Sequence, residues 1–372
     1  MNNARTDTRW RAIQGWVKGA SHIRSGKPNQ DRIKFSDRPS EIFPLVLAVA
    51  DGHGSKSYFR SDKGAEFAVE SGIEVSKKLG IETWDSIKDK KFFEALCREI
   101  VQKWLEKVIA DIQMNTFTPE EKLLLLTKKE TSPKRPGIFQ NENVIAYGST
   151  LIIAVVHESF ILYLQLGDGD ILLVSSHGDV DRPLPKDERL FGNETTSLCL
   201  PESWSDFRYR LYPIDHLSPA PALILLSTDG YANSFIKDSE FEKVGVDLLD
   251  IICENEEGFL SGIDYIQKNI DTWLDIASNK GSGDDTTVGI LCNLDQIEKY
   301  FEENYAENHT KKVRPSEKSD DPSCKMQNEN PEKNVPALHS TEVIINDSPE
   351  ESLNENSKSP LSTNMKLEMN KS

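Results

Sequence analysis

The chain has 372 residues, of which 37% are hydrophobic and 28% charged, so it is long enough for one large domain or two ordinary ones. Its formal net charge of −17 argues against nonspecific binding to nucleic acid or to an anionic membrane surface. The five cysteines show no paired spacing and no apolar run is long enough to cross a bilayer, so we expect a cytoplasmic protein without a disulfide scaffold or a zinc–thiolate site.

Short apolar runs predict a succession of strands. The run Leu45–Ala50 is continuous, which is typical of a strand buried on both faces. The full set of predicted strands is Trp10–Lys18, Leu45–Ala50, Thr150–Val156, Phe160–Gln165, Ile171–Ser175, Phe207–Leu211, Ala222–Ser227 and Thr287–Cys292.

Helices are predicted in two separate pairs. The first pair is Lys63–Leu79 and Lys91–Ile112, and in the second of these segments apolar side chains recur at every fourth residue. The other pair is Phe241–Cys253 and Phe259–Ala277. Because strands outnumber helices and the helices are paired, the pattern favours an α+β fold over a doubly wound sheet.

The polar segments mark the limits of the folded part. Residues 127–145 are predicted to be a polar insertion, and residues 177–206 a long irregular excursion. No Phe, Trp or Tyr follows Tyr305, and a core needs large apolar side chains to offset the entropy of ordering the chain. We therefore place one domain at 8–295, followed by a short helical stretch, and expect a disordered polar tail at 306–372.

Aspartates stand where several of the predicted strands begin or end. Asp51 and Asp229 each follow a strand, Asp168 follows another, and Asp284 and Asp285 precede the last one. Carboxylates gathered at one edge of a sheet cannot all be ionised without cations. Hard oxygen ligands suit Mg²⁺ or Mn²⁺, and the glycine after Asp51 allows a backbone carbonyl to approach a metal.

Each of these residues also has an ordinary structural explanation. An Asp-Gly pair after a strand is usually a tight turn, and the adjacent acids at Asp284 and Asp285 are compatible with a loop cap. His53, two residues after Asp51, is placed to give a proton to a leaving alkoxide, but it could equally be a solvated loop histidine. The case for a metal site rests on the ordered recurrence of the aspartates.

Six short motifs then occur in an order that resembles the PPM family, also called protein phosphatase 2C, particularly its bacterial branches. Together with the N-terminal segment Gly19–His22, they cover about residues 19–292. They are Pro28–Asp31, Val49–Gly54, Gly148–Thr150, Gly167–Asp170, Ser227–Gly230 and Gly283–Val288.

The resemblance implies a central β-sandwich of two antiparallel sheets flanked by helical pairs, a four-layer αββα arrangement with two or three Mg²⁺ or Mn²⁺ ions at one end. It implies that Asp51 bridges two metals, that Gly52 offers its carbonyl, and that Asp229 and Asp284 complete one shell. Asp31 matches an acidic position near that shell and Asp168 the position of a third metal. His53 matches the general acid, and residues 177–206 match a flap beside the cleft.

The sequence departs from the family pattern at three places. At residues 167–169 it has Gly-Asp-Gly in place of the commoner Gly-Asp-Ser-Arg, which bears on the third metal. Gln30 stands where the family often has Glu, which exchanges an acidic ligand for a neutral oxygen donor. Gly26 stands where the family commonly has the arginine that holds the substrate phosphate, which leaves Arg24 and Lys27 as the flanking candidates. Lysine would bind phosphate as a point charge, without the bidentate fork of arginine.

The function implied is hydrolysis of phosphoserine or phosphothreonine in proteins by a water that bridges the two metals, without a phosphoenzyme. The expected partner is a phosphorylated protein that is the target of a Ser/Thr kinase. Two alternatives remain open at this point: a noncatalytic module of the same fold that binds phosphoproteins, and a hydrolase of small phosphoesters. Retention of Asp51, Asp229 and Asp284 argues against the first, and the lack of a nucleotide-binding P-loop argues against nucleotide substrates in the second.

Overall fold

The fold is built from two five-stranded antiparallel sheets, seen in a computed structural model that describes residues 9–36, 43–80, 87, 89–129, 142–189, 195–215 and 218–305. The first sheet has the order β1-β10-β9-β6-β7 and the second the order β2-β3-β4-β5-β8. The strands are β1 (Trp10–Val17), β2 (Arg32–Phe35), β3 (Leu45–Ala50), β4 (Leu151–Val156), β5 (Phe160–Leu166), β6 (Asp170–Val174), β7 (Val180–Asp181), β8 (Arg208–Pro213), β9 (Leu223–Ser227) and β10 (Thr286–Asn293).

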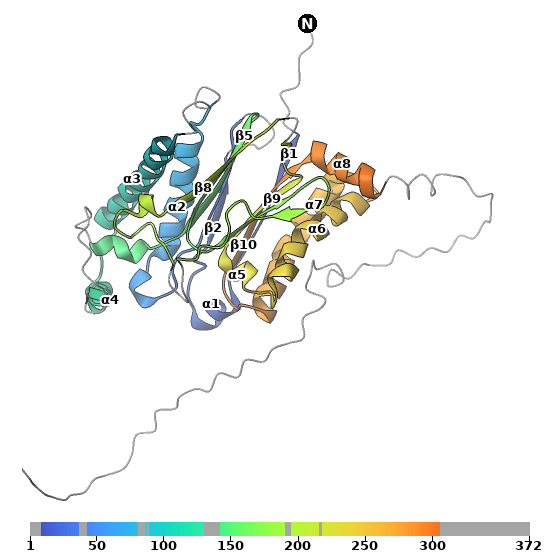
Figure 1. Ribbon diagram of the computed structural model, residues 1–372. Coiled ribbons are helices and arrows are strands. Elements are labelled where there is room, and N and C mark those ends of the chain that lie inside the picture. Colours follow the sequence, from blue (N-terminus) through green and yellow to red (C-terminus); the bar gives the residue numbers. More distant parts are fainter. Residues whose placement is uncertain are drawn as a thin grey trace, which may run out of the picture. The chain divides into compact units, whose positions relative to one another are not determined.

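Helices cover the outer face of each sheet, as Figure 1 shows. The α-helices are α1 (Ala20–Ser25), α2 (Ser61–Ser76), α3 (Lys90–Met114), α4 (Pro119–Lys129), α5 (Asp229–Ala232), α6 (Asp238–Glu254), α7 (Phe259–Lys280) and α8 (Leu294–Asn304). Three short 3₁₀ helices are η1 (Lys56–Tyr58), η3 (Glu142–Tyr147) and η4 (Ser203–Ser205). No helix among the described residues is long and apolar enough to span a membrane.

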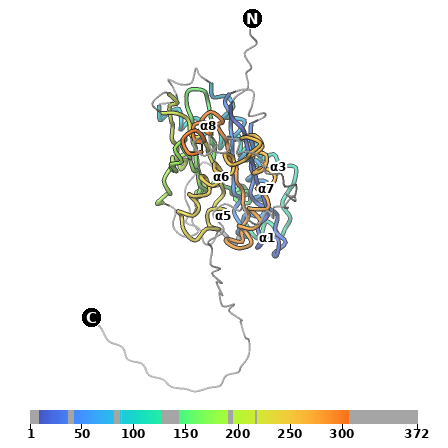
Figure 2. Tube along the Cα trace, turned by 90° about the vertical axis from the view of Figure 1, so that its right-hand side faces the viewer, coloured from blue at the N-terminus to red at the C-terminus, as the bar shows by residue number. Residues whose placement is uncertain are grey.

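Three apolar cores hold these layers together. One lies between the two sheets and includes Leu47 and Ile224. A second lies between the second sheet and helices α2 and α3, and the third lies between the first sheet and helices α6 and α7, which face the viewer in Figure 2. Two sheets packed face to face between two pairs of helices make four layers, so the predicted αββα sandwich is confirmed.

The long elements follow from the apolar patterns in the sequence. Every residue of β3 is buried, as its continuous apolar run predicts. In α3 the side chains of Leu96, Ile100, Trp104 and Val108 all face the core. Asp89 caps the N-terminus of this helix, since its carboxylate accepts from the amide of Lys91.

Some short elements carry no such pattern. The helices α1 and α4 and the strand β2 are not among the predicted elements. Strand β2 is four residues long and is recognisable only through its pairing with β3, in which Arg32 lies opposite Ala50. Within the predicted polar insertion, α4 extends to Lys129 and η3 begins at Glu142, while residues 130–141 lie outside the described residues.

The pairing of strands brings the candidate aspartates to one end of the sandwich. In the second sheet Arg32 pairs with Ala50, so Asp31 and Asp51 are at the same end. In the first sheet Ser227 pairs with both Val288 and Asp170, so the segments before β10, after β9 and before β6 also meet there. The last helix, α8, packs on α6 and β10 through Leu294, Ile297 and Tyr300, and the predicted tail at 306–372 lies outside the described residues.

Candidate metal centre

Asp51 is held by backbone contacts on both sides of the loop that follows β3. Its amide donates to Oγ1 of Thr150 at 2.9 Å, and its carbonyl accepts from the amide of Thr150 at 2.8 Å. The next amide, that of Gly52, donates to the carbonyl of Gln30 at 3.1 Å. A Cβ at Gly52 would lie 2.5 Å from the carbonyl oxygen of Ser61, so only glycine fits this crowded turn.

Three of the predicted metal ligands meet at this end of the sandwich. Ligand atoms of Asp51, Asp168 and Asp229 lie within 4.8 Å of one another. Asp229 is the first residue of α5, and Asp168 is the exposed tip of the turn between β5 and β6. Gly167, which precedes Asp168, has a φ of 107°, a conformation that favours glycine and allows this tight connection between the two sheets.

Burial, and then mutual repulsion, raise the pKa values of Asp51 and Asp229. Desolvation is the largest cause for Asp51, followed by the charges of Asp31, Asp229 and Asp284, and its pKa lies well above the ordinary value. The pKa of Asp229 is raised to about 7, first by desolvation and then by the charges of Asp168 and Asp284. A cluster of carboxylates that destabilise one another's ionised forms is suited to bind divalent cations, and all-oxygen donors suit Mg²⁺ or Mn²⁺.

Asp31 is buried behind this cluster and joins the two sheets. One of its carboxylate oxygens accepts from both Oγ1 of Thr228 at 2.7 Å and Oγ1 of Thr287 at 2.8 Å. Burial, and then the charge of Asp285, raise its pKa well above the ordinary value, while the two hydroxyls act in the opposite direction. Asp31 is therefore near the site, but it is outside the group that Asp51, Asp168 and Asp229 form.

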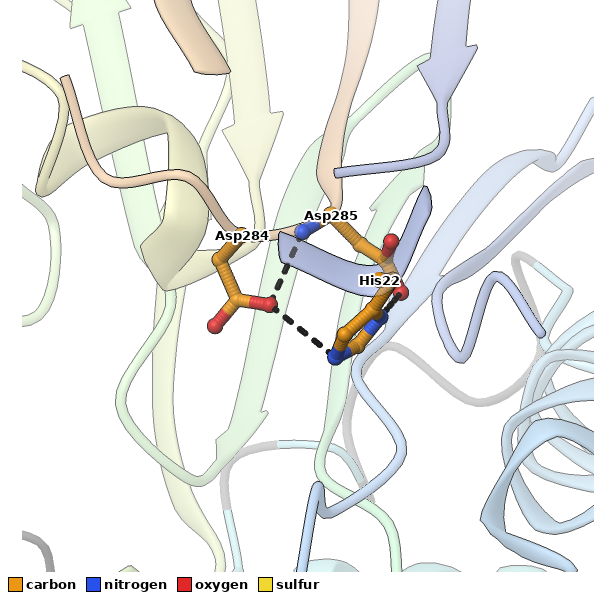
Figure 3. A group of neighbouring side chains, drawn as sticks. All are labelled: His22, Asp284 and Asp285. Carbon is orange, nitrogen blue, oxygen red and sulfur yellow. Dashed lines mark hydrogen bonds and ion pairs between the residues drawn. The ribbon is translucent and has the colours of Figure 1, made fainter. Parts of the chain in front are cut away.

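The two acids before β10 have different environments (Figure 3). The Asp285 side chain is 3% exposed and accepts from the amides of Gly19 at 2.6 Å and Gln30 at 2.7 Å. It also contacts Nδ1 of His22 at 2.8 Å. The Asp284 side chain is 53% exposed, and its charge contributes to the raised pKa values of Asp51 and Asp229. Asp284 is thus the acid available for a ligand, and Asp285 anchors the N-terminal segment.

His53 is fixed next to Asp51 by its own backbone. Its amide donates to the carbonyl of Gly148 at 3.1 Å, and its carbonyl accepts from Nε2 of Gln30 and Oγ of Ser61. The imidazole ring meets the ring of Tyr58 edge-on, with 4.7 Å between the ring centres. These contacts fix the backbone of His53 in the loop that carries Asp51, and its imidazole packs against Tyr58.

The two candidates for phosphate binding differ in position. Nζ of Lys27 donates to the carbonyl of Gly54 at 2.8 Å, at the end of the loop that carries Asp51 and His53. Arg24 lies on the exposed surface of α1. Lys27 is therefore the basic side chain anchored to the loop of the candidate site.

The Oε1 atom of Gln30 is buried and has no hydrogen-bond partner among the described residues.

The excursion 177–206 is tied to the site from both of its ends. Arg182 donates to Asp170 at 3.0 Å and to Asp238 and Glu242 on α6 at 2.7 Å each. At the other end, the amide of Leu198 donates to the carbonyl of Ser149 at 2.9 Å. Residues 190–194 lie outside the described part of the chain.

The sequence by itself indicated no role for His22, Thr228 or Thr287, and it did not distinguish Asp285 from Asp284. These four residues contact the candidate ligands or their neighbours through partners far away in the chain. The one local signal was the position of these residues inside the quoted motifs, because a buried polar residue next to a ligand usually orients it.

Comparison with known proteins agrees with this architecture. A family profile described as Protein phosphatase 2C matches residues 18–275, which is more than half of the chain. No curated protein matches the chain in sequence.

Several solved structures are similar at low sequence identity. The catalytic domain of the serine/threonine phosphatase PstP in complex with two manganese ions is 13% identical, with a TM-score of 0.45 over 76% of this chain and 97% of that one. The phosphatase Stp1 from Staphylococcus aureus is 12% identical, with a TM-score of 0.44 over 78% and 98%. PppA, a regulatory component of a secretion system in Pseudomonas aeruginosa, is 13% identical, with a TM-score of 0.44 over 77% and 98%. On the match of the family profile, this chain belongs to the protein phosphatase 2C family of protein serine/threonine phosphatases.

Proposed function

We propose that the chain hydrolyses phosphoserine and phosphothreonine in proteins, with divalent cations held by the aspartates at the end of the sandwich. The observation that carries the proposal is the convergence of Asp51, Asp168 and Asp229 within 4.8 Å in a chain of this family. A binding module without catalysis would not need several carboxylates that oppose one another's ionisation.

The donor set fits two cations and a weaker third. Asp51 would contact both of the first two, with the carbonyl of Gly52 on one side and Asp229 and Asp284 on the other, and Asp168 would hold the third. Two such cations, when bound, would acidify a water and neutralise charge on the phosphoryl oxygens during direct attack. Asp31 would lie behind these ligands and add negative charge near the cations, with its carboxylate held by Thr228 and Thr287.

His53 would give a proton to the departing serine or threonine oxygen. His53 follows Asp51 by two residues in the same loop, and its imidazole packs edge-on against the ring of Tyr58. The three buried cysteines take no part in this chemistry. Burial raises the pKa of Cys97 and Cys253 to about 12, and that of Cys292 still further, so these thiols do not act as nucleophiles near neutral pH.

Lys27 would hold the substrate phosphate in place of the family's arginine. Its ammonium group reaches the carbonyl of Gly54, so it lies beside the loop that carries Asp51 and His53. An ammonium group attracts phosphate as a point charge without fixing its orientation, so the cations would largely orient the substrate phosphate.

The test is hydrolysis of a panel of phosphoserine, phosphothreonine and phosphotyrosine peptides and small phosphoesters by the full chain. We expect activity on the first two classes with Mn²⁺ or Mg²⁺, loss of activity with EDTA and recovery when metal is restored. Preference for small phosphoesters would favour the alternative hydrolase, and phosphopeptide binding without turnover at any metal concentration would favour the binding module. Full activity in metal-free protein would exclude the cation-dependent mechanism.

A further inference from the structure

His22 has one ring nitrogen paired and the other directed at a candidate metal ligand. The residue lies on α1 and is 8% exposed. Its Nδ1 lies 2.8 Å from Oδ2 of Asp285, and its Nε2 lies 3.7 Å from Oδ1 of Asp284 (Figure 3). The imidazole therefore stands between a buried carboxylate and an exposed one.

The hydrogen bonds of Asp285 indicate that Nδ1 of His22 carries a proton. The carboxylate of Asp285 already accepts from two backbone amides, those of Gly19 and Gln30, and an ionised carboxylate can only accept. Nδ1 of His22 is therefore the donor in its contact with Asp285. In the neutral ring this leaves a lone pair on Nε2, which faces Asp284.

The distance between Nε2 and Oδ1 of Asp284 is close to the separation of two ligands of one ion. At 3.7 Å it exceeds the range of a hydrogen bond, and among the described residues Nε2 makes no hydrogen bond. Two donors that each lie about 2.1 Å from a common ion are about 3.0 Å apart at a right angle and about 3.6 Å apart at 120°. Ligand atoms of His22, Asp284 and Asp285 all lie within 4.8 Å of one another.

The segment that carries His22 is fixed to the loop that carries Asp284. The amide and the hydroxyl of Ser21 both donate to the carbonyl of Gly283, at 2.8 and 2.7 Å. Oγ of Ser278 accepts from the amide of Ala20 and donates to the carbonyl of Asp284. Both candidate ligands are thus held in place by the backbone, as a preorganised site requires.

We propose that Nε2 of His22 is a nitrogen ligand of the divalent cation at Asp284, and that the buried Asp285 orients it. The inference rests on the proposed function, since it adds a donor to the cation site proposed there. A metal-binding histidine usually gives its other N–H to a carboxylate, which is the arrangement of His22 and Asp285. An imidazole ligand favours a transition ion over Mg²⁺, which takes oxygen ligands, so the site should select Mn²⁺ over Mg²⁺.

The experiment is pulsed electron paramagnetic resonance of the full chain loaded with Mn²⁺, which detects ¹⁴N nuclei bonded to the ion. We expect nitrogen coupling in the wild type and in His53→Asn, and its loss in His22→Asn, in which the side-chain amide can still donate to Asp285. His177→Asn is the matched control, because His177 is an exposed histidine paired with Glu303. In His22→Asn the Kd for Mn²⁺ should rise about 10-fold or more, and the Kd for Mg²⁺ should change less.

Two kinds of result overturn the inference. If the wild type binds Mn²⁺ and hydrolyses phosphopeptides but shows no nitrogen coupling, or if the coupling survives in His22→Asn, then His22 is not a ligand, while the proposed function stands. If the wild type binds no divalent cation, both proposals fail. Should His22→Asn not fold, the presence or absence of nitrogen coupling in His53→Asn decides the matter.

Discussion

The guanidinium group of Arg208 donates a hydrogen bond of 2.9 Å to Oε1 of Gln165, and Nε2 of Gln165 donates in turn to the carbonyls of Gly167 and Gly169. Arg208 also donates to the carbonyl of Pro185, in the excursion beside the site. The turn that presents Asp168 is therefore connected through two side chains to that excursion. Because Gln165 is buried, no solvent competes for these bonds.

Replacing this glutamine should loosen the turn. Gln165→Leu leaves the two glycine carbonyls and the Arg208 guanidinium without their partner, at a cost of about 1–3 kcal/mol. We expect faster hydrogen exchange in residues 166–170 of the metal-free protein, and a higher Mn²⁺ concentration for half-maximal activity. Arg210→Gln on the same strand is the control, because Arg210 stacks on Tyr212 instead. Unchanged exchange in Gln165→Leu would show that the turn holds its shape without this side chain.

Asp229→Asn should remove most activity while leaving the fold intact. Asp229 is one of the three clustered carboxylates, and loss of a charged group aimed at the reacting centre commonly costs about 10²–10³-fold in kcat. The same change removes a repelling charge, so the metal-free variant should melt at a higher temperature than the metal-free wild type. Turnover at the wild-type rate at saturating Mn²⁺ would remove Asp229 from the ligand set. Asp51→Asn and Asp284→Asn should behave alike.

The stability of the metal-free protein should fall as the pH rises towards neutrality. The pKa of Asp229 is about 7 in the folded state and near 4 when unfolded, so between these values the folded state holds a proton that the unfolded state does not. Stability decreases with pH wherever the folded state binds more protons. Thermal unfolding in EDTA should therefore show a lower Tm at pH 7.5 than at pH 5.5. The decrease of Tm between pH 5.5 and pH 7.5 should be smaller in Asp229→Asn than in the wild type. An equal decrease would mean that groups other than Asp229 cause the pH dependence.

His53→Ala should lower kcat on phosphopeptides much more than on p-nitrophenyl phosphate. A serine alkoxide needs a proton as the bond breaks, whereas nitrophenolate leaves readily without one. General acid catalysis is worth about 10²–10⁴-fold, so the two losses should differ clearly when kcat is measured at saturating Mn²⁺. Equal fractional losses on both substrates would mean that His53 only organises the loop it shares with Asp51.

Lys27→Ala should raise KM for a phosphopeptide about 10-fold or more, because a hydrogen bond to a charged group contributes about 1.5–3 kcal/mol. Arg24→Ala is the comparison, because Arg24 lies on the exposed surface of α1. We expect the KM of this variant to stay close to that of the wild type. Steady-state kinetics on one peptide decides between the two residues. A larger effect at Arg24 would reverse the assignment.

The sequence by itself determined the parts of this protein that depend on local pattern. Continuous apolar runs such as Leu45–Ala50 predicted strands, because a strand buried on both faces is apolar at every residue. The four-residue repeat in Lys91–Ile112 predicted a helix, because burial of one helix face fixes the spacing of its apolar residues. Aspartates at strand ends, with their glycines, predicted where a cation site would form. Short elements such as β2 were not predictable, because four residues of mixed polarity carry no period.

Only the tertiary structure decided which polar side chains serve these aspartates. His22 and Asp285 are separated by 263 positions in the chain, and their contact exists only once β1 pairs with β10 in the first sheet. Asp31 and Thr228 are separated by 197 positions, and their contact exists only once the two sheets pack. The sequence placed Asp284 and Asp285 side by side as equals. Packing exposes the first and buries the second, because the carboxylate of Asp285 is enclosed by the amides of Gly19 and Gln30, whereas the side chain of Asp284 stays 53% exposed.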